Sequence, residues 1–132
     1  MLKTYEKWHK LKFFTNARLL RPKHFKAGEV WWCMVGENIG YEIDGKGDEF
    51  LGPVLIIKKF SSGAFFGLPF TSKQKNQKPY YYIIPEAYEL GPILFSQGRT
   101  YDSVRLKRYK TTIGRRLLSD IRLQYAKYLE LL

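Results

Sequence analysis

Side chains that could transfer protons or bind phosphate occur in two parts of the chain. Glu42 and Lys46 belong to a segment rich in glycine and charge, residues 36–51, and Thr71 and Ser72 follow the apolar run at residues 64–70. A carboxylate and a hydroxyl can move protons in a reaction, and a lysine attracts anionic groups. These residues therefore indicate proton-transfer chemistry beside a bound polyanion.

Three predicted strands would hold these residues in place. Residues 30–35 and 54–57 are short apolar runs with β-branched and aromatic residues, typical of buried strands. Ser61-Ser62-Gly63 predicts a hairpin turn, after which residues 64–70 return as a third strand. The connection between the first two strands is long, and loops of that kind in a compact domain are usually functional or disordered.

The hairpin register decides which hydroxyl meets the end of the long loop. A two-residue turn at Ser61-Ser62 places Gly52 opposite Thr71, whereas a three-residue turn that includes Gly63 places Gly52 opposite Ser72. In both registers a hydroxyl lies across from the point where the loop rejoins the sheet. We therefore expect the loop and the hydroxyl to share one surface pocket.

The remaining segments predict a mixed fold. Residues 2–14 read as an amphipathic helix, residues 80–84 and 92–97 as strands, and residues 99–106 as a strand or 3₁₀ segment. Gly98 suggests a bulge or a close backbone approach. The last segment predicts a helix from Arg115, with apolar residues on one face: Leu117, Leu118, Ile121, Tyr125, Tyr128, Leu129 and Leu132. Short strands with a terminal helix indicate an α+β fold built on a small barrel-like sheet.

Composition narrows the class of partner. The chain has 132 residues, enough for one domain, and 23 basic against 12 acidic residues give a net charge of +11. Such an excess favours a polyanion, and exposed aromatic side chains could stack the bases of single-stranded RNA. Lys73, Lys75 and Lys78 flank the predicted pocket. The single cysteine, Cys33, is expected to be a buried free thiol, and without an apolar leader or membrane span we expect a cytoplasmic protein.

Several other site types are excluded by their spacing. Residues 40–47 nearly match a phosphate-binding P-loop, but Gly47 stands where the magnesium-binding Ser or Thr should follow Lys46. The acidic residues of the loop lack the spacing of a calcium site, and the two histidines with Cys33 fit no zinc pattern. We therefore expect neither a metal nor a cofactor.

Two stretches of sequence carry a specific resemblance. The first joins GEVWWCMVGENIGYEIDGKGDEFLGPVLIIKKF to LPFTSKQK, and the second is SQGRTYDSVRL, followed by Ile113-Gly114 ahead of the last helix. Together they resemble the MazF/PemK family, the toxins of bacterial toxin–antitoxin pairs. The resemblance covers residues 25–132, and the first residues resemble a helical extension found in one branch of the family. We accordingly divide the chain into an N-terminal extension, 1–26, and a barrel domain, 27–132.

The resemblance implies a small SH3-like barrel, a homodimer, and metal-independent cleavage of single-stranded mRNA. In that chemistry the ribose 2′-OH attacks its own phosphate, a base and an acid move the protons, and a cation stabilises the phosphorane. The implied partners are single-stranded RNA, a cognate antitoxin protein and, together with the antitoxin, operator DNA. Carried onto this chain, the catalytic set is Glu42, Thr71 and Ser72, and the RNA-binding set is Lys46, Lys73, Lys75, Lys78, Gln97 and Arg99.

One departure from the family pattern concerns the catalytic arginine. In the family it immediately precedes the proline of the second strand, and here that position is Gly52. Glycine supplies no cation, so transition-state stabilisation worth about 3 kcal/mol would be missing unless Lys46 or Arg99 replaces it. We therefore expect a weakened ribonuclease. The alternatives are an inactive family member that binds RNA or the antitoxin, and a barrel whose aromatic surface binds only protein.

Overall fold

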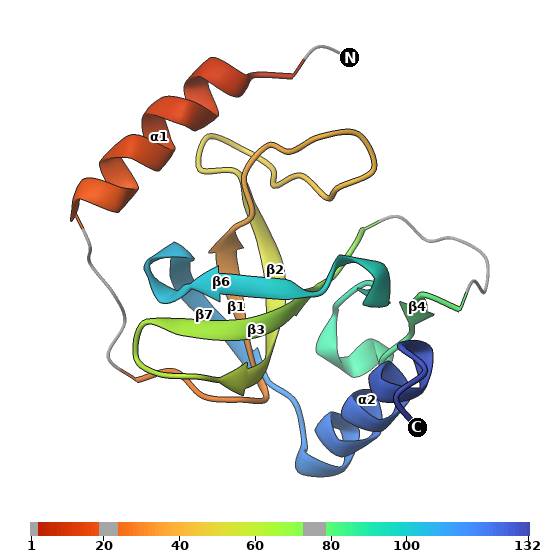
Figure 1. The fold of residues 1–132 in the computed structure, drawn as a ribbon. Helices are drawn as coiled ribbons and strands as arrows, with labels where there is room; N and C mark the ends of the chain where they lie inside the picture. The colour runs from red at the N-terminus through yellow and green to blue at the C-terminus, as the bar shows by residue number, and fades with distance from the viewer. Residues whose placement is uncertain (1–2, 19–23, 73–78) are drawn as a thin grey trace.

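The computed structural model describes residues 3–18, 24–72 and 79–132. A helix at each end of the chain flanks a strongly bent sheet (Figure 1). The elements, in chain order, are α1 (Tyr5–Arg18), β1 (Glu29–Met34), β2 (Leu51–Lys59), β3 (Ala64–Pro69), β4 (Tyr81–Tyr82), η1 (Glu86–Tyr88), β5 (Ile93–Leu94), η2 (Phe95–Gln97), β6 (Arg99–Asp102), η3 (Ser103–Arg105), β7 (Leu106–Thr112) and α2 (Arg115–Tyr128). The expected α+β class is confirmed.

The main sheet has five antiparallel strands in the order β6-β3-β2-β1-β7. β6 and β7 lie at opposite edges, although only the short η3 separates them in sequence. The sheet must therefore curl until its two edges approach each other, which gives the barrel-like shape in Figure 1. Ser103 of η3 fastens this curl, because its backbone N–H and its hydroxyl donate hydrogen bonds to Gly63 O (2.9 Å) and Ser62 O (2.6 Å) in the β2–β3 turn.

The β2–β3 hairpin combines the two registers that the sequence left open. Phe60 N–H donates to Ala64 O, so Ser61-Ser62-Gly63 forms a three-residue turn. A bulge between Ile56 and Lys58 then shifts the pairing by one residue, and further along the ladder Val54 pairs with Pro69. Continuing that pairing places Gly52 level with Thr71, as the two-residue alternative predicted.

The core is divided by the sheet. One cluster lies between the sheet, α2 and the small β4–β5 hairpin, with Val30, Leu55, Leu68, Ile93 and Ile121 fully buried. A second cluster fills the inside of the curl, with Phe25, Cys33, Val54, Phe65 and Tyr101. A third, smaller cluster joins Trp8 of α1 to Met34 and Phe50.

The structure also corrects several predicted boundaries. α1 begins at Tyr5 and continues to Arg18, and α2 ends at Tyr128, so Leu129 and Leu132 lie beyond its end and are exposed. β7 was missed because Lys107 and Arg108 face solvent on an edge strand, where charge is tolerated and hides the strand pattern. In the described ranges, α1 and α2 are too short and too polar to span a membrane.

Candidate active site

The long loop, residues 36–50, folds back on itself. Gly45 N–H donates to Gly36 O (2.7 Å), and Lys46 and Leu51 exchange backbone hydrogen bonds of 2.8 and 2.9 Å. A Cβ at Gly45 would lie 1.7 Å from Phe50 O, so only glycine fits there. Phe50 itself adopts a positive φ of 54°, which is uncommon for a residue with a side chain. The loop is therefore a compact unit that ends at Phe50, directly before β2 begins at Leu51.

Lys46 crosses from this loop to the end of β3. Its ammonium donates a hydrogen bond to Ser72 Oγ over 2.7 Å at an exposed position. The Lys46–Leu51 bridge also places the backbone of Lys46 beside the first residue of β2, and Leu51 is the neighbour of Gly52 in sequence. The loop and one of the two expected hydroxyls therefore meet, through Lys46 and Ser72.

The backbone of Thr71 also contacts Gly91 and Pro92, two residues that the sequence analysis did not propose for the site. Its backbone N–H donates to Pro92 O (2.9 Å). A Cβ at the neighbouring Gly91 would lie 1.8 Å from Thr71 O, so the backbones at these two residues are in close contact. A Gly-Pro pair ahead of a short strand was the available signal, since glycine often marks a close backbone approach.

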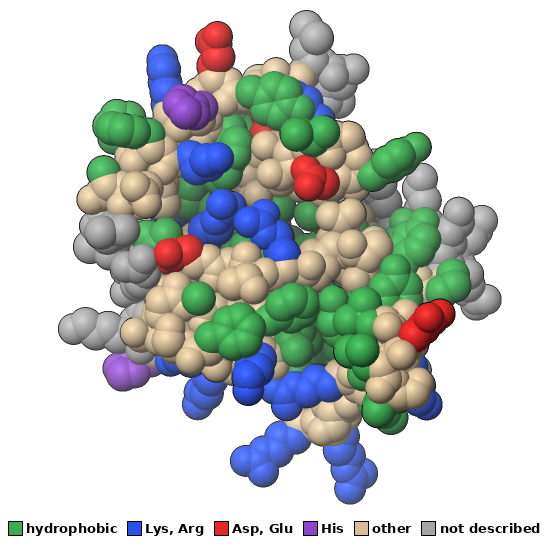
Figure 2. Space-filling model, in the orientation of Figure 1, with side chains coloured by type: hydrophobic (Ala, Val, Ile, Leu, Met, Phe, Trp, Pro, Cys, Tyr) green, Lys and Arg blue, Asp and Glu red, His purple; other side chains and the backbone are tan. Residues whose placement is uncertain are grey.

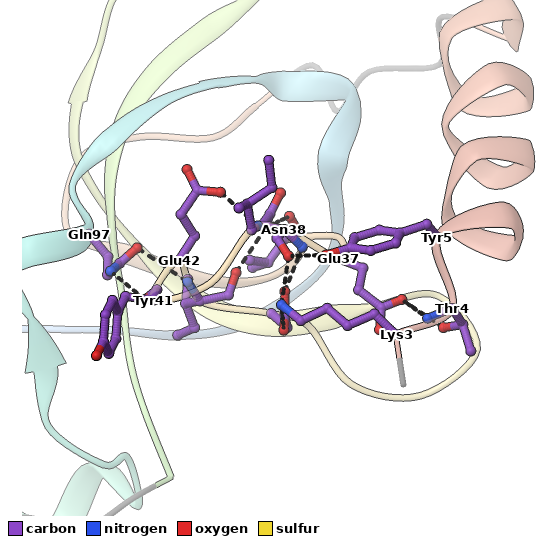
Figure 3. Close-up of polar contacts among 12 residues, drawn as sticks. Lys3, Thr4, Tyr5, Glu37, Asn38, Tyr41, Glu42 and Gln97 are labelled. Atoms are coloured by element: carbon purple, nitrogen blue, oxygen red, sulfur yellow. Dashed lines mark hydrogen bonds and ion pairs between the residues drawn. The ribbon is translucent and has the colours of Figure 1, made fainter. Parts of the chain in front are cut away.

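Glu42 is anchored within its own loop. Its Oε1 accepts a hydrogen bond from Ile39 N–H (2.8 Å), and the described contacts do not join it to Lys46 or Ser72. Gln97 fixes the residues on both sides, because its Oε1 accepts from Ile43 N–H (3.2 Å) and its Nε2 donates to Tyr41 O (3.1 Å) (Figure 3). The amide of Gln97 thereby holds the backbone on both sides of Glu42.

Gly52 leaves the end of β2 without a side chain. By strand alternation a side chain here would point to the same side as Val54, toward the inside of the curl. The nearest atom to a Cβ built on Gly52 is Val35 Cγ2, at 3.3 Å. That contact is tight by a few tenths of an ångström, so a larger residue fits if Val35 adjusts.

Two arginines, Arg99 and Arg105, lie beside the second core cluster, the one inside the curl of the sheet. The Arg99 guanidinium lies 4.7 Å from the Tyr101 ring centre, and Arg105 Nη1 donates to Met34 O (3.0 Å). Burial lowers the pKa of Arg105, and the nearby charge of Arg99 lowers it further. Figure 2 shows Lys and Arg side chains gathered in a hollow in the middle of this face, next to β6. The described part of the chain holds no cluster of acidic, His or Cys side chains suited to a metal ion.

Comparison with known proteins identifies the family of this chain. Residues 26–129 match the family described as PemK-like, MazF-like toxin of type II toxin-antitoxin system. The chain belongs to this family. No curated protein matches it in sequence.

Solved structures of MazF proteins share the fold. A MazF crystal structure from Deinococcus radiodurans is similar with a TM-score of 0.65 and 20% identity, covering 84% of this chain and 98% of that one. A mycobacterial endoribonuclease in complex with its cognate antitoxin gives 0.60 and 17%, covering 83% and 98%. A MazE-MazF complex from D. radiodurans gives 0.61 and 17%, covering 86% and 100%.

Against the MazF/PemK pattern, the structure brings together some predicted site residues and separates others. Lys46 meets Ser72, next to Thr71, whereas Glu42 and Gln97 meet through the backbone of the loop. Arg99 is exposed, with its guanidinium over Tyr101. The predicted RNA-binding residues Lys73, Lys75 and Lys78 lie outside the described residues.

Proposed function

We propose that this MazF/PemK family member is a toxin that cleaves single-stranded RNA without a metal. The observation that carries the proposal is the 2.7 Å contact between Lys46 Nζ and Ser72 Oγ, beside Thr71 and Gly52. A cation next to a hydroxyl pair suits a phosphate whose charge increases in the transition state. Lys46 takes over, from a different point of the chain, the charge that the family's arginine supplies.

The reaction follows from the chemistry of RNA. The ribose 2′-OH attacks the adjacent phosphorus and the bond to the 5′ oxygen breaks, which leaves a cyclic 2′,3′-phosphate and a free 5′-OH. Glu42 takes the proton of the 2′-OH, water protonates the leaving 5′ oxygen, and the hydroxyls of Thr71 and Ser72 donate hydrogen bonds to the phosphate. Lys46 balances the charge on the non-bridging oxygens. DNA is not cleaved, because it lacks the attacking hydroxyl.

The rest of the surface supports an RNA substrate and a protein partner. Tyr41 is fully exposed at the edge of the site, where it can stack an unpaired base. Arg99, Gln97 and the lysines at 73, 75 and 78 complete the proposed RNA-binding surface. Two of the similar solved structures are complexes with an antitoxin, which supports a cognate antitoxin for this chain. We also propose that the chain acts as a homodimer in the cytoplasm, and that toxin and antitoxin together bind operator DNA.

The direct test is cleavage of a long single-stranded RNA by the purified protein, with and without EDTA and with a DNA of the same sequence as control. We expect cleavage of the RNA alone, unchanged by EDTA and ending in cyclic phosphates. RNA binding should also weaken steeply with salt, because lysine–phosphate contacts release counterions. Loss of cleavage in EDTA would contradict the metal-independent mechanism.

A second candidate is an inactive family member that binds RNA or the antitoxin. Gly52 favours it, because the strand end that carries the arginine in the family has no side chain here. The Glu42 carboxylate also makes its described contact within its own loop. This candidate predicts salt-sensitive RNA binding and no cleavage, so the same experiment separates the two.

A further inference from the structure

The N-terminal helix lies outside the part of the chain that matches the family, residues 26–129. Among the side chains of the helix whose burial is described, residues 5–17, only Trp8 is deeply buried: it is 6% exposed and packs against Met34 and Phe50. The Trp8 and Phe50 ring centres are 5.4 Å apart. A Cβ at Gly36 would lie 2.3 Å from the Trp8 ring, so the loop backbone rests directly on the indole. Trp8 therefore supports both ends of the 36–50 loop, at Gly36 and at Phe50.

A row of polar contacts joins the start of this helix, and the two residues before it, to the loop (Figure 3). Thr4 donates to Glu37 Oε2 from both its backbone N–H and its hydroxyl, each over 2.7 Å. Tyr5 Oη donates to Asn38 O (3.0 Å). Two lysines form ion pairs: Lys3 Nζ lies 2.8 Å from Asp44 Oδ2, and Lys7 Nζ lies 2.6 Å from Asp48 Oδ1. The Lys7 contact lowers the pKa of Asp48. Exposed ion pairs of this kind are individually weak, so the buried Trp8 supplies the anchor and the polar row sets the orientation.

These contacts also change the charge that the loop presents to RNA. Residues 36–50 contain five carboxylates and one lysine, a net charge of −4, which would repel a phosphate backbone. Helix-side donors engage three of the carboxylates (Glu37, Asp44 and Asp48), and Lys107 lies 3.7 Å from Glu49. Glu42 is left, held by the loop's own backbone. The N-terminal segment thus engages three carboxylates that have no role in the proposed reaction and makes no described contact with the proposed base.

We propose that the N-terminal segment, through Lys3, Thr4, Lys7 and Trp8, is a positioning element for the site. It holds the 36–50 loop in the conformation that brings Lys46 to Ser72, and it lowers the loop's negative charge beside the RNA. The proposal has two parts. The effect on RNA rests on the proposed function, whereas the holding of the loop conformation is a structural claim that does not depend on it. None of these residues touches the reacting atoms, so they act through the loop.

Hydrogen exchange tests the structural half, whether or not the protein cleaves RNA. In Trp8→Ala, we expect the amides of Val35, Gly36 and Lys46, which are hydrogen-bonded within the loop, to exchange at least tenfold faster than in the wild type. The amides of the β2–β3 ladder should keep their wild-type rates, and Trp8→Phe should restore most of the protection. Wild-type exchange in the loop of Trp8→Ala would overturn the proposal.

A pair of charge variants tests the effect on RNA and does not depend on the fate of Trp8→Ala. Lys7→Gln removes the contact with Asp48, whereas Lys10→Gln makes the same change in net charge on an exposed residue of the same helix that has no ion pair in the described structure. We expect Lys7→Gln to speed exchange in the loop and to weaken RNA binding at low salt by more than Lys10→Gln does. Equal behaviour of the two variants in both measurements would overturn the proposal. If loop exchange responds as expected but no variant cleaves RNA, the positioning role stands and the proposed nuclease function fails.

Discussion

Lys46 and Ser72 are 26 residues apart in sequence, yet the lysine ammonium donates a hydrogen bond to the serine hydroxyl over 2.7 Å. This contact links the 36–50 loop to the segment that follows β3, one residue beyond Thr71, which is level with Gly52. It places a cation where the strand itself carries none. Electrostatic stabilisation depends on where a charge lies relative to the phosphate and not on the strand that carries it, so in the proposed mechanism Lys46 replaces the missing arginine.

The role of Lys46 is tested by Lys46→Ala. Removing one group that stabilises charge in the transition state lowers kcat by about 10²- to 10³-fold in other enzymes, and we expect a loss in that range. Lys58→Ala is the matched control, because Lys58 is exposed near the opposite end of β2 and its loss changes the net charge equally. The measurement is single-turnover cleavage of RNA. A variant as active as the wild type would show that another cation fills the role.

Gly52→Arg restores the residue type that the family carries at this position. We expect it to raise cleavage at least tenfold, which corresponds to about 1.4 kcal/mol of barrier. Gly52→Ala serves as control, because it brings the same Cβ contact with Val35 without the guanidinium. In the Gly52→Arg background, Thr71→Ala and Glu42→Ala should each remove much of the gain, since groups acting on one phosphate work as a unit. If Gly52→Arg and Gly52→Ala behave alike, the added charge does not reach the phosphate.

Gly91→Ala tests whether the site depends on the backbone that supports Thr71. The added Cβ would lie 1.8 Å from Thr71 O, so the backbone must move and carry Ser72 away from Lys46. We expect cleavage to fall by at least tenfold, about 1.4 kcal/mol of barrier, with the cooperative unfolding transition retained. Gly63→Ala is the control, since the nearest atom to its Cβ is a serine hydroxyl oxygen at an ordinary 3.5 Å. Wild-type activity in Gly91→Ala would show that cleavage does not depend on the position of the Thr71 backbone.

Cys33 reports on opening of the barrel. It is fully buried, and this burial raises the pKa of its thiol to about 12. Because the folded-state pKa is raised above its usual value, the neutral thiol stabilises the fold below that usual value, and the benefit is lost as pH rises toward 12. We expect Ellman's reagent at pH 8 to react only as fast as the protein opens, and Cys33→Ser to reduce the fall in unfolding free energy between pH 9 and about 12. Rapid reaction of the native protein would show that the thiol is accessible.

Sequence patterns located the strands whose side chains are buried on both faces. Residues 54–57 were recognised as a strand because their apolar run has no polar interruption, and they form the middle of β2. β7 was not predicted, because it is an edge strand with solvent-facing charges and its partner β1 lies far away in sequence. The close approach predicted at Gly98 is confirmed, since a Cβ there would lie 2.5 Å from Tyr125 Oη.

The candidate site was predictable only in part. The family resemblance proposed Glu42 and Thr71 as catalytic residues, the charge of the loop suggested Lys46 as an RNA contact, and the hairpin predicted a hydroxyl opposite Gly52. The contact of Lys46 with Ser72 could not be read from the sequence, because it depends on how residues 36–50 fold back, which is fixed by Phe50 at positive φ and by the space that Gly45 leaves. The packing of Trp8 against the loop could not be predicted from the sequence either. A single buried tryptophan on a mostly exposed helix gives no periodic pattern that would indicate which residues it contacts.

The bulge between Ile56 and Lys58 separates two properties that a regular hairpin would couple. In a ladder without a bulge, adding or removing a residue in the turn at 61–63 would slide Thr71 past Gly52 and dismantle the site. Here the bulge offsets the length of the turn before the ladder reaches Val54. A lineage could therefore change its hairpin tip, and compensate by gaining or losing the bulge, while the site end of the strands stays in register.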